Sequence, residues 1–135
     1  MFKQEPITSF SEIRLRISGM RLTEIFEIIC RGDTAEISQY YVRYDKEGDR
    51  NELVRRAEQP AEAIVDLLDQ CRVLRWDGFS GKNPPGVRDG VMFTFTAQIN
   101  GKTVRADGSN NFPKHYRDFL NAVMDHLQKT EQQNL

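Results

Sequence analysis

The segment VMFTFTAQINGKTVRA, residues 91–106, carries the clearest structural pattern in the chain. As far as Ile99, apolar residues alternate with mostly polar ones, the period of two expected of a strand with one buried face. Asn100-Gly101 follows, and this dipeptide is the strongest short-range signal for a β-hairpin. A two-residue turn there places Ala97 opposite Val104 and Phe95 opposite Ala106. Both pairs are apolar, so turn and register agree on a hairpin with one face in the core.

Alternation also predicts strands earlier in the chain. Residues 11–19 alternate cleanly, and residues 23–31 carry apolar side chains on both faces. Gly32-Asp33 predicts a two-residue turn that sets Ile28 opposite Ile37.

The strand after that turn departs from regular alternation. Phe26 opposes Gln39, whereas Tyr40 and Val42 fall on the other face. A β-bulge repairs such a slip, and a turn longer than two residues is the alternative. Residues 51–58 then form a weaker fourth strand, whose arginines and glutamate are typical of a sheet edge.

Two segments show the three- and four-residue spacing of amphipathic helices. The first opens at Pro60, where the missing N–H costs nothing, and ends near Arg75. Asn110 or Asn111 caps the second, with Pro113 in its first turn. The buried stripes are Ile64, Leu67, Leu68, Cys71 and Leu74 in the first helix, and Tyr116, Phe119, Leu120, Val123 and Leu127 in the second.

These elements follow the order β-β-β-β-α-β-β-α. The simplest assembly is an α+β fold: a single antiparallel sheet with both helices packed on its apolar face. No linker, repeat or low-complexity segment divides the chain, so we expect residues 1–135 to form a single domain. The polar residues 129–135 are expected to fray at the C-terminus.

Composition argues against several classes of protein. With 19 basic and 20 acidic residues the formal net charge is −1, which lacks the basic excess of a nucleic-acid-binding module. No stretch approaches 18 apolar residues, and the N-terminus has no apolar signal region. We therefore expect a cytoplasmic protein with no nucleic-acid and no membrane partner. Cys30 and Cys71 fall on apolar faces and give neither a disulfide framework nor a metal pattern.

Residues 76–90 and 107–113 are rich in glycine, proline and polar side chains. Loops longer than about 4–6 residues more often bind or cover a ligand. The predicted hairpin brings both segments to the same end of the sheet, beside the start of the last helix. We predict a cleft there for an anionic group. The candidate ligand-binding residues are Asp77, Lys82, Asn83, Arg88, Asp89, Ser109, Asn110, Lys114 and His115.

A structural interpretation of the same residues is the stronger one. Serine, asparagine and aspartate are ordinary turn and cap residues, and Asp77 can accept backbone N–H groups. Trp76 directly follows an amphipathic helix and is expected to close the core, with Phe79 as a second plug.

No catalytic residue, metal site or cofactor is predicted. His115 and His126 lie three helical turns apart, roughly 16 Å, so they cannot share one metal ion. His126 is expected to be exposed near the C-terminus. Neither cysteine has a partner base that would activate it as a nucleophile.

The stretch Trp76-Asp77-Gly78-Phe79 is followed by the hairpin and then by the pattern G-S-N-N-F-P-x-x-Y at residues 108–116. Over residues 68–127 this combination resembles a group of small bacterial proteins with no assigned activity. The resemblance implies a bacterial α+β domain and transfers no functional residue.

Three functions remain open, in this order of preference. The first is a small non-enzymatic binding or interaction protein, adaptor-like or immunity-like, with a protein partner on the open sheet face or on residues 76–90. The second is an enzyme or small-anion-binding protein with its site between residues 76–90 and 107–113. The third is a structural homodimer formed through the sheet. The side chains expected at that dimer interface are Ile25, Ile29, Tyr40, Tyr41 and Tyr44.

Overall fold

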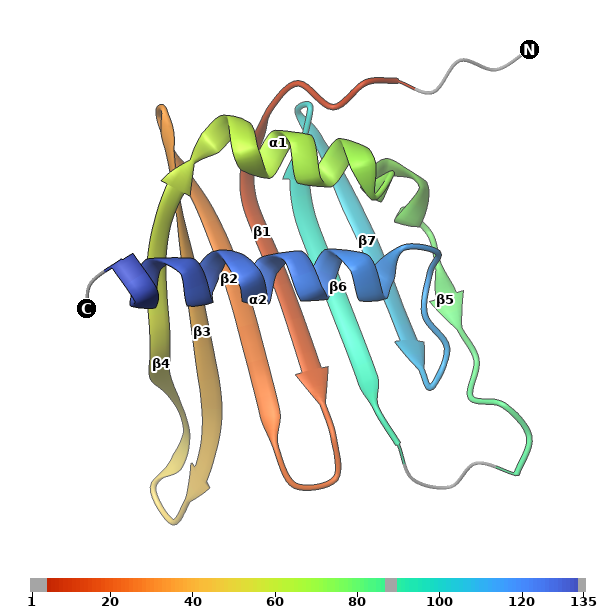
Figure 1. Ribbon diagram of the computed structural model, residues 1–135. Helices are drawn as coiled ribbons and strands as arrows, with labels where there is room; N and C mark the ends of the chain where they lie inside the picture. The colour runs from red at the N-terminus through yellow and green to blue at the C-terminus, as the bar shows by residue number, and fades with distance from the viewer. Residues whose placement is uncertain (1–4, 87–89, 134–135) are drawn as a thin grey trace.

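The computed structural model describes residues 5–86 and 90–133, where two α-helices cover one face of a seven-stranded sheet (Figure 1). The strands are β1 (Phe10–Ser18), β2 (Thr23–Arg31), β3 (Thr34–Asp45), β4 (Gly48–Pro60), β5 (Ser80–Gly81), β6 (Met92–Ile99) and β7 (Lys102–Ser109). The helices are α1 (Ala61–Gln70) and α2 (Tyr116–Gln133), and a short 3-10 helix, η1 (Val73–Trp76), follows α1. The strand order across the sheet is β4-β3-β2-β1-β6-β7-β5.

The predicted α+β class and the packing of both helices on one sheet face are confirmed. In Figure 1, α1 crosses the strands near one end of the sheet and α2 crosses them near the middle. The apolar face of the sheet and the buried stripes of both helices form one hydrophobic cluster. Its largest fully buried side chains include Trp76, Phe93, Phe95 and Phe119.

Both predicted two-residue turns are confirmed with their registers. In the β6–β7 hairpin Ala97 pairs with Val104, and in the β2–β3 hairpin Ile28 pairs with Ile37. Asn100 and Gly101 have φ values of 52° and 74°, as a type I′ turn requires at its two central positions. Local sequence therefore determines these pairings.

The prediction of a purely antiparallel sheet is wrong at one edge, where β5 pairs in parallel with β7. The sheet is mixed, and the predicted order β-β-β-β-α-β-β-α lacks both η1 and the extra strand β5. A strand of two residues is too short to display a period of two. Its partner residues also lie far along the chain, since Ser80 bonds to Asp107, 27 positions away.

The predicted slip in alternation corresponds to a β-bulge between β3 and β4. Gln39 pairs with Arg55 and Tyr40 pairs with Leu53, which leaves Val54 as the extra residue. The inserted residue thus lies in β4, whereas the sequence pattern pointed to β3. β4 is also longer than the predicted 51–58, because its ends are held by backbone pairing to β3 rather than by apolar side chains.

The helix boundaries differ from the predicted ones. α1 ends at Gln70 instead of near Arg75, because Arg72 adopts a left-handed conformation with φ of 53° and η1 begins after it. α2 begins at Tyr116, so Asn110 and Asn111 lie too far upstream to cap it. His126, expected to be exposed, is half-buried, and its carbonyl accepts a hydrogen bond from Gln59.

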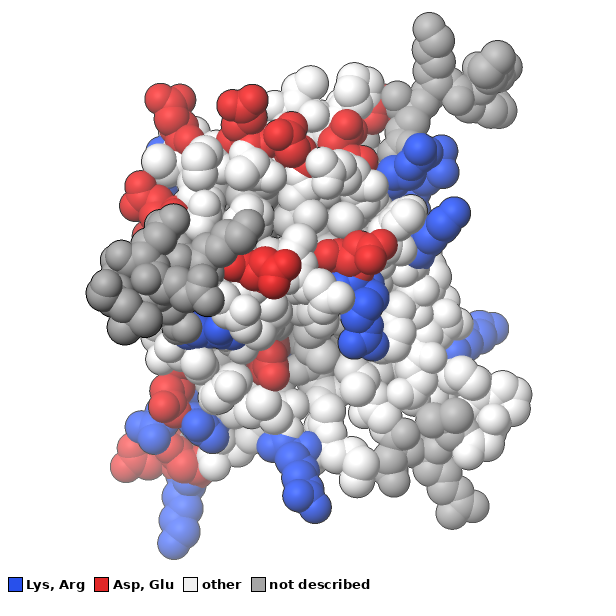
Figure 2. All heavy atoms as spheres, viewed as in Figure 1, with Lys and Arg blue, Asp and Glu red and all other residues white. Residues whose placement is uncertain are grey.

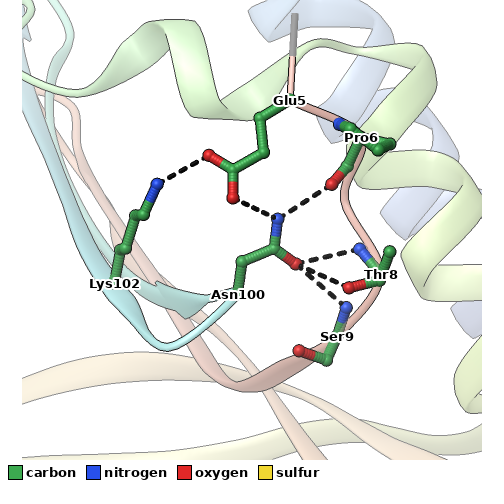
Figure 3. A network of polar contacts seen from close by, with 6 residues as sticks. All are labelled: Glu5, Pro6, Thr8, Ser9, Asn100 and Lys102. Atoms are coloured by element: carbon green, nitrogen blue, oxygen red, sulfur yellow. Dashed lines mark hydrogen bonds and ion pairs between the residues drawn. The ribbon is translucent and has the colours of Figure 1, made fainter.

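Asn100 has a second role that the hairpin pattern did not indicate (Figure 3). Its Oδ1 accepts hydrogen bonds from the backbone N–H groups of Thr8 and Ser9, at 2.9 and 3.2 Å. Its Nδ2 donates to the Pro6 carbonyl at 2.9 Å, and Lys102 forms an ion pair with Glu5 at 2.6 Å. The turn thereby anchors the segment that leads into β1.

Trp76 belongs to the core, as expected, with only 1% of its surface exposed. The centroid of its ring lies 5.0 Å from that of Phe95 and 5.4 Å from that of Phe119, and both ring pairs are in an edge-to-face arrangement. Its Nε1 donates a hydrogen bond to the Lys114 carbonyl at 3.0 Å. Trp76 therefore joins η1, β6 and α2 in one contact.

Replacing Trp76 with alanine should lower the free energy of unfolding by about 3–5 kcal/mol, because it leaves a large cavity at this junction. Trp76→Phe keeps an aromatic ring against Phe95 and Phe119 and should cost clearly less. Urea denaturation followed by far-UV circular dichroism measures both. A loss below about 1 kcal/mol for Trp76→Ala would contradict a core role.

Candidate functional site

The two unusual segments lie side by side, as the hairpin geometry predicted. The Gly78 N–H donates to the Arg105 carbonyl at 2.8 Å, and the Asp107 N–H donates to the Phe79 carbonyl at 3.0 Å. Ser80 Oγ bonds to an Asp107 carboxylate oxygen at 3.0 Å. Residues 78–81 are thus hydrogen-bonded along the edge of β7.

Several predicted ligand-binding side chains are occupied in holding this loop. Asp77 Oδ1 accepts the Arg105 N–H at 3.0 Å. Asn110 Oδ1 accepts the Val91 N–H at 2.8 Å, while its Nδ2 donates to Asn83 Oδ1 at 2.6 Å. These bonds use the side-chain groups that a ligand would need.

The backbones also approach too closely for a cleft between the two segments. A Cβ on Gly81 would lie 2.5 Å from the Asn111 carbonyl oxygen, and one on Gly108 would lie 2.1 Å from the same atom. Only glycine fits at these two positions. The Asn111 side chain adds a 3.3 Å bond to the Lys82 carbonyl.

The remaining predicted residues are not gathered at one place. The Lys82 side chain is exposed, and Ser109 lines a shallow hollow on the helix-free face of the sheet with Arg16 and Thr94. Arg88 and Asp89 lie outside the described residues.

Lys114 and His115 border a separate basic hollow of about 480 Å³, shared with Arg72 and Arg75 at the end of α1. His115 has a φ of 69° and stands next to the first residue of α2. Its Nδ1 lies 3.2 Å from the Asp118 carboxylate. We refer to this site as the basic hollow.

A larger groove, which the sequence analysis did not predict, lies on the helix side of the sheet. Beyond α2, the strands β1 and β2 continue to their connecting turn without a helix in front of them (Figure 1). A groove of about 720 Å³ lies at this place. We call it the α2 groove. Its apolar lining consists of Ile17, Met20, Leu22, Val91, Phe112, Tyr116 and Leu120.

The α2 groove was missed because its lining comes from separate parts of the chain. The lining residues come from β1, the β1–β2 turn, β2, the residue before β6, the segment before α2 and the first turns of α2. One signal was available in the sequence. Met20 and Leu22 are apolar residues in a turn, and Met20 is 76% exposed.

Tyr116 is the most unusual residue of the α2 groove. Its side chain is 5% exposed and stacks on Phe112, with ring centroids 4.6 Å apart. The hydroxyl is buried and has no hydrogen-bond partner among the described residues. Burial raises the pKa of Tyr116 to about 12, so the phenol is protonated at neutral pH and can donate.

Charged side chains border the α2 groove. Arg21, Glu24 and Arg117 all line it. Glu24 accepts a hydrogen bond from Gln39 Nε2 at 3.4 Å. Within residues 5–86 and 90–133, neither Arg21 nor Arg117 forms an ion pair. The groove therefore carries a local excess of positive charge.

Exposed acidic residues lie on both helices, and those on α2 include Asp118 and Asp125. Acidic side chains gather along α1, at the top of Figure 2, where Glu62, Asp66 and Asp69 are exposed. The α2 groove faces the opposite end of the sheet. An anion would meet repulsion along α1 and near Asp118, and attraction at Arg21 and Arg117 on the groove border.

The described part of the chain has neither a metal-ligand cluster nor a membrane-spanning helix. No group of three or more His, Cys, Asp or Glu residues there could hold a metal ion. Neither helix in that part is long and apolar enough to cross a membrane. Cys71 is buried, and burial raises its pKa to about 11, which keeps the thiol protonated.

Removing the side chain of Asn110 should release the loop from β6. Asn110→Ala deletes the bonds to Val91 and Asn83 and leaves a residue with φ of 51° that alanine adopts poorly. We expect a loss of stability of about 1–3 kcal/mol and faster tryptic cleavage after Lys82. Asn121→Ala, on the exposed side of α2, is the matched control. An unchanged rate of tryptic cleavage in Asn110→Ala would contradict the role of Asn110 in holding the loop.

Comparisons with known proteins identify no relative, since no family model, no curated protein and no solved structure matches this chain significantly. Functional assignment therefore depends on the geometry and chemistry of the two candidate sites: the α2 groove and the basic hollow.

Proposed function

We propose that this protein is a non-enzymatic binding protein that holds a small, largely apolar molecule in the α2 groove. The observation that carries the proposal is the uncovered part of the apolar sheet face below α2. Sites for small organic ligands typically measure about 300–1,000 Å³ and combine apolar walls with a few polar groups. The volume of about 720 Å³ and the lining of the groove match that description.

Burial of an apolar ligand would complete the packing of this region. Val91 is 37% exposed, and Ile17, Leu22 and Leu120 are only partly buried. Apolar area removed from water contributes roughly 25 cal/mol per Å². A ligand that covers these side chains would therefore gain free energy from surface that is exposed in the free protein.

A neutral fluorophore tests the groove without involving charge. N-phenyl-1-naphthylamine should bind with a blue-shifted, enhanced emission, because it enters an apolar site. Leu22→Glu places a carboxylate in the groove wall and should weaken binding at least about tenfold, as a buried unpaired charge would. Fluorescence titration measures the dissociation constant.

Leu53→Glu is the matched control, since Leu53 is 46% exposed on β4 and does not line the groove. This variant should bind the fluorophore as the unchanged protein does. Equal weakening in both variants, or no binding to the unchanged protein, would refute the groove as the site.

The basic hollow supports a second candidate, a small-anion-binding protein, which retains part of the site predicted from the sequence. Arg72, Arg75, Lys114 and His115 place three permanent cations and one titratable group around about 480 Å³. Charge-assisted hydrogen bonds to phosphate oxygens are among the stronger polar contacts. The hollow has this chemistry, whereas residues 77–83 are bonded directly to residues 105–111.

Inorganic phosphate and pyrophosphate should raise the melting temperature if the basic hollow binds anions. Lys114→Gln should abolish the increase, because it removes one cation and keeps the backbone carbonyl that accepts from Trp76. Lys82→Gln is the control, since Lys82 is outside the hollow. Equal stabilisation of both variants would indicate a nonspecific salt effect and remove this candidate.

A protein partner or a second copy on the helix-free sheet face is less favoured. The hydroxyl of Tyr40 accepts from Arg56, and that of Tyr44 donates to Thr23. Ile25 is 2% exposed. The hydroxyls of Tyr40 and Tyr44 thus already have partners on the sheet, and Ile25 is already covered, although Tyr44 is 60% exposed.

A further inference from the structure

We propose that the ligand of the α2 groove is a small amphipathic carboxylic acid, whose carboxylate is bound by Tyr116 and Arg117 and whose apolar body covers Leu22 and Leu120. This inference rests on the proposed function, because it names the class of molecule that the same groove selects. Three observations carry it: an unpartnered hydroxyl, an excess of positive charge and an apolar floor.

The Tyr116 hydroxyl is the first observation. Buried hydroxyl groups nearly always find a hydrogen-bond partner, because an unpaired one loses its interaction with water and gains nothing. Phenylalanine would offer the same stacking on Phe112 and Phe93 without that cost. A tyrosine in this position is explained if the hydroxyl acquires its partner when a ligand binds.

Tyr116 lines the groove, and its buried hydroxyl lies within electrostatic reach of two other lining residues. Burial is the main cause of the raised pKa of Tyr116, while Arg117 lowers that pKa and Glu24 raises it, so both charged groups are close enough to act on the phenol. Both residues also line the α2 groove. A ligand oxygen in this part of the groove would give the hydroxyl the acceptor that it lacks in the free protein.

The charges select the sign of the ligand. Glu24 already accepts a hydrogen bond from Gln39, whereas Arg117 and Arg21 form no ion pair within residues 5–86 and 90–133. Arginine binds carboxylates through two parallel N–H bonds. A carboxylate can therefore receive the phenol O–H and a guanidinium together, while an ammonium group would face two uncompensated arginines.

The apolar floor selects an amphipathic molecule. Ile17, Leu22, Val91 and Leu120 leave room below α2 for a hydrocarbon or aryl body, and Met20 stands exposed at the entrance. Inorganic anions would leave this surface in contact with water. The groove is thus expected to bind an acid with a hydrophobic tail more tightly than a simple anion or a neutral hydrocarbon.

A different account of Tyr116 is a direct hydrogen bond to Glu24 in the free protein. The two accounts give opposite results for Tyr116→Phe. Under the ligand account, the free variant melts at the same temperature or higher, because a costly unpaired group is removed. Under the Glu24 account, the free variant melts at a lower temperature.

Isothermal titration calorimetry with octanoate and 1-octanol tests the inference, because the two share a tail and differ in the head group. Octanoate should bind at least about tenfold more tightly than 1-octanol, as expected for a charge-assisted pair. Tyr116→Phe and Arg117→Gln should each weaken octanoate about five- to tenfold and leave 1-octanol unchanged. Arg105→Gln, an exposed arginine on β7, is the control and should change neither.

The outcomes separate this inference from the proposed function. Equal affinities for octanoate and 1-octanol, or a lower melting temperature for free Tyr116→Phe, would overturn the carboxylate assignment and leave the groove as an apolar site. Failure of octanoate, 1-octanol and the neutral fluorophore alike would overturn both. Octanoate affinity that is lost in Arg105→Gln as well would show surface charge attraction and also overturn the assignment.

Discussion

The contact between Trp76 and the aromatic rings around it is the constraint on which the rest of the structure depends. The indole packs edge-on against Phe95 of β6 and Phe119 of α2, and its N–H holds the Lys114 carbonyl. Trp76 is thus the last residue of η1, packs on the sheet, and holds the segment that leads into α2. Because α2 is held across the middle of the strands, no helix in residues 5–86 and 90–133 covers the far part of the apolar face. The α2 groove is therefore a consequence of where this junction lies.

The parts of the fold that the sequence predicted are those whose signals are local. Asn100-Gly101 and Gly32-Asp33 set their turns through backbone conformations that few residues adopt, and the flanking apolar residues then fix the register. The edge strand β5 and the end of α1 gave no such signal. β5 forms because residues 78–81 pair with β7. α1 ends because the backbone of Arg72 adopts the left-handed conformation, and Trp76 then lies in the core. Both depend on contacts made after the chain has folded.

The candidate site shows the same limit in chemical terms. Glycine, asparagine and aspartate are selected both by ligand-binding loops and by loops that must bond to themselves. Asp77, Asn83 and Asn110 are of the second kind, because their acceptors and donors meet backbone groups or one another. The position of these segments was predictable from the hairpin, but the partners of their side chains were not. The α2 groove, in contrast, is built mainly from residues that periodicity assigns to an ordinary core.

In Tyr116, the aromatic ring contributes to the packing of the core, whereas the hydroxyl has no part in that packing. The helical period marked it correctly as a buried position, and any aromatic residue would satisfy the stacking on Phe112 and the contact with Trp76. The hydroxyl adds nothing to that packing and is left without a partner among the described residues. Features that oppose local stability tend to be found at functional sites, where a later interaction offsets their cost. The apolar lining explains why a ligand would enter the groove, but only the phenol and the neighbouring arginines distinguish one ligand from another. The selectivity of the groove therefore depends on a side chain that the fold itself does not need.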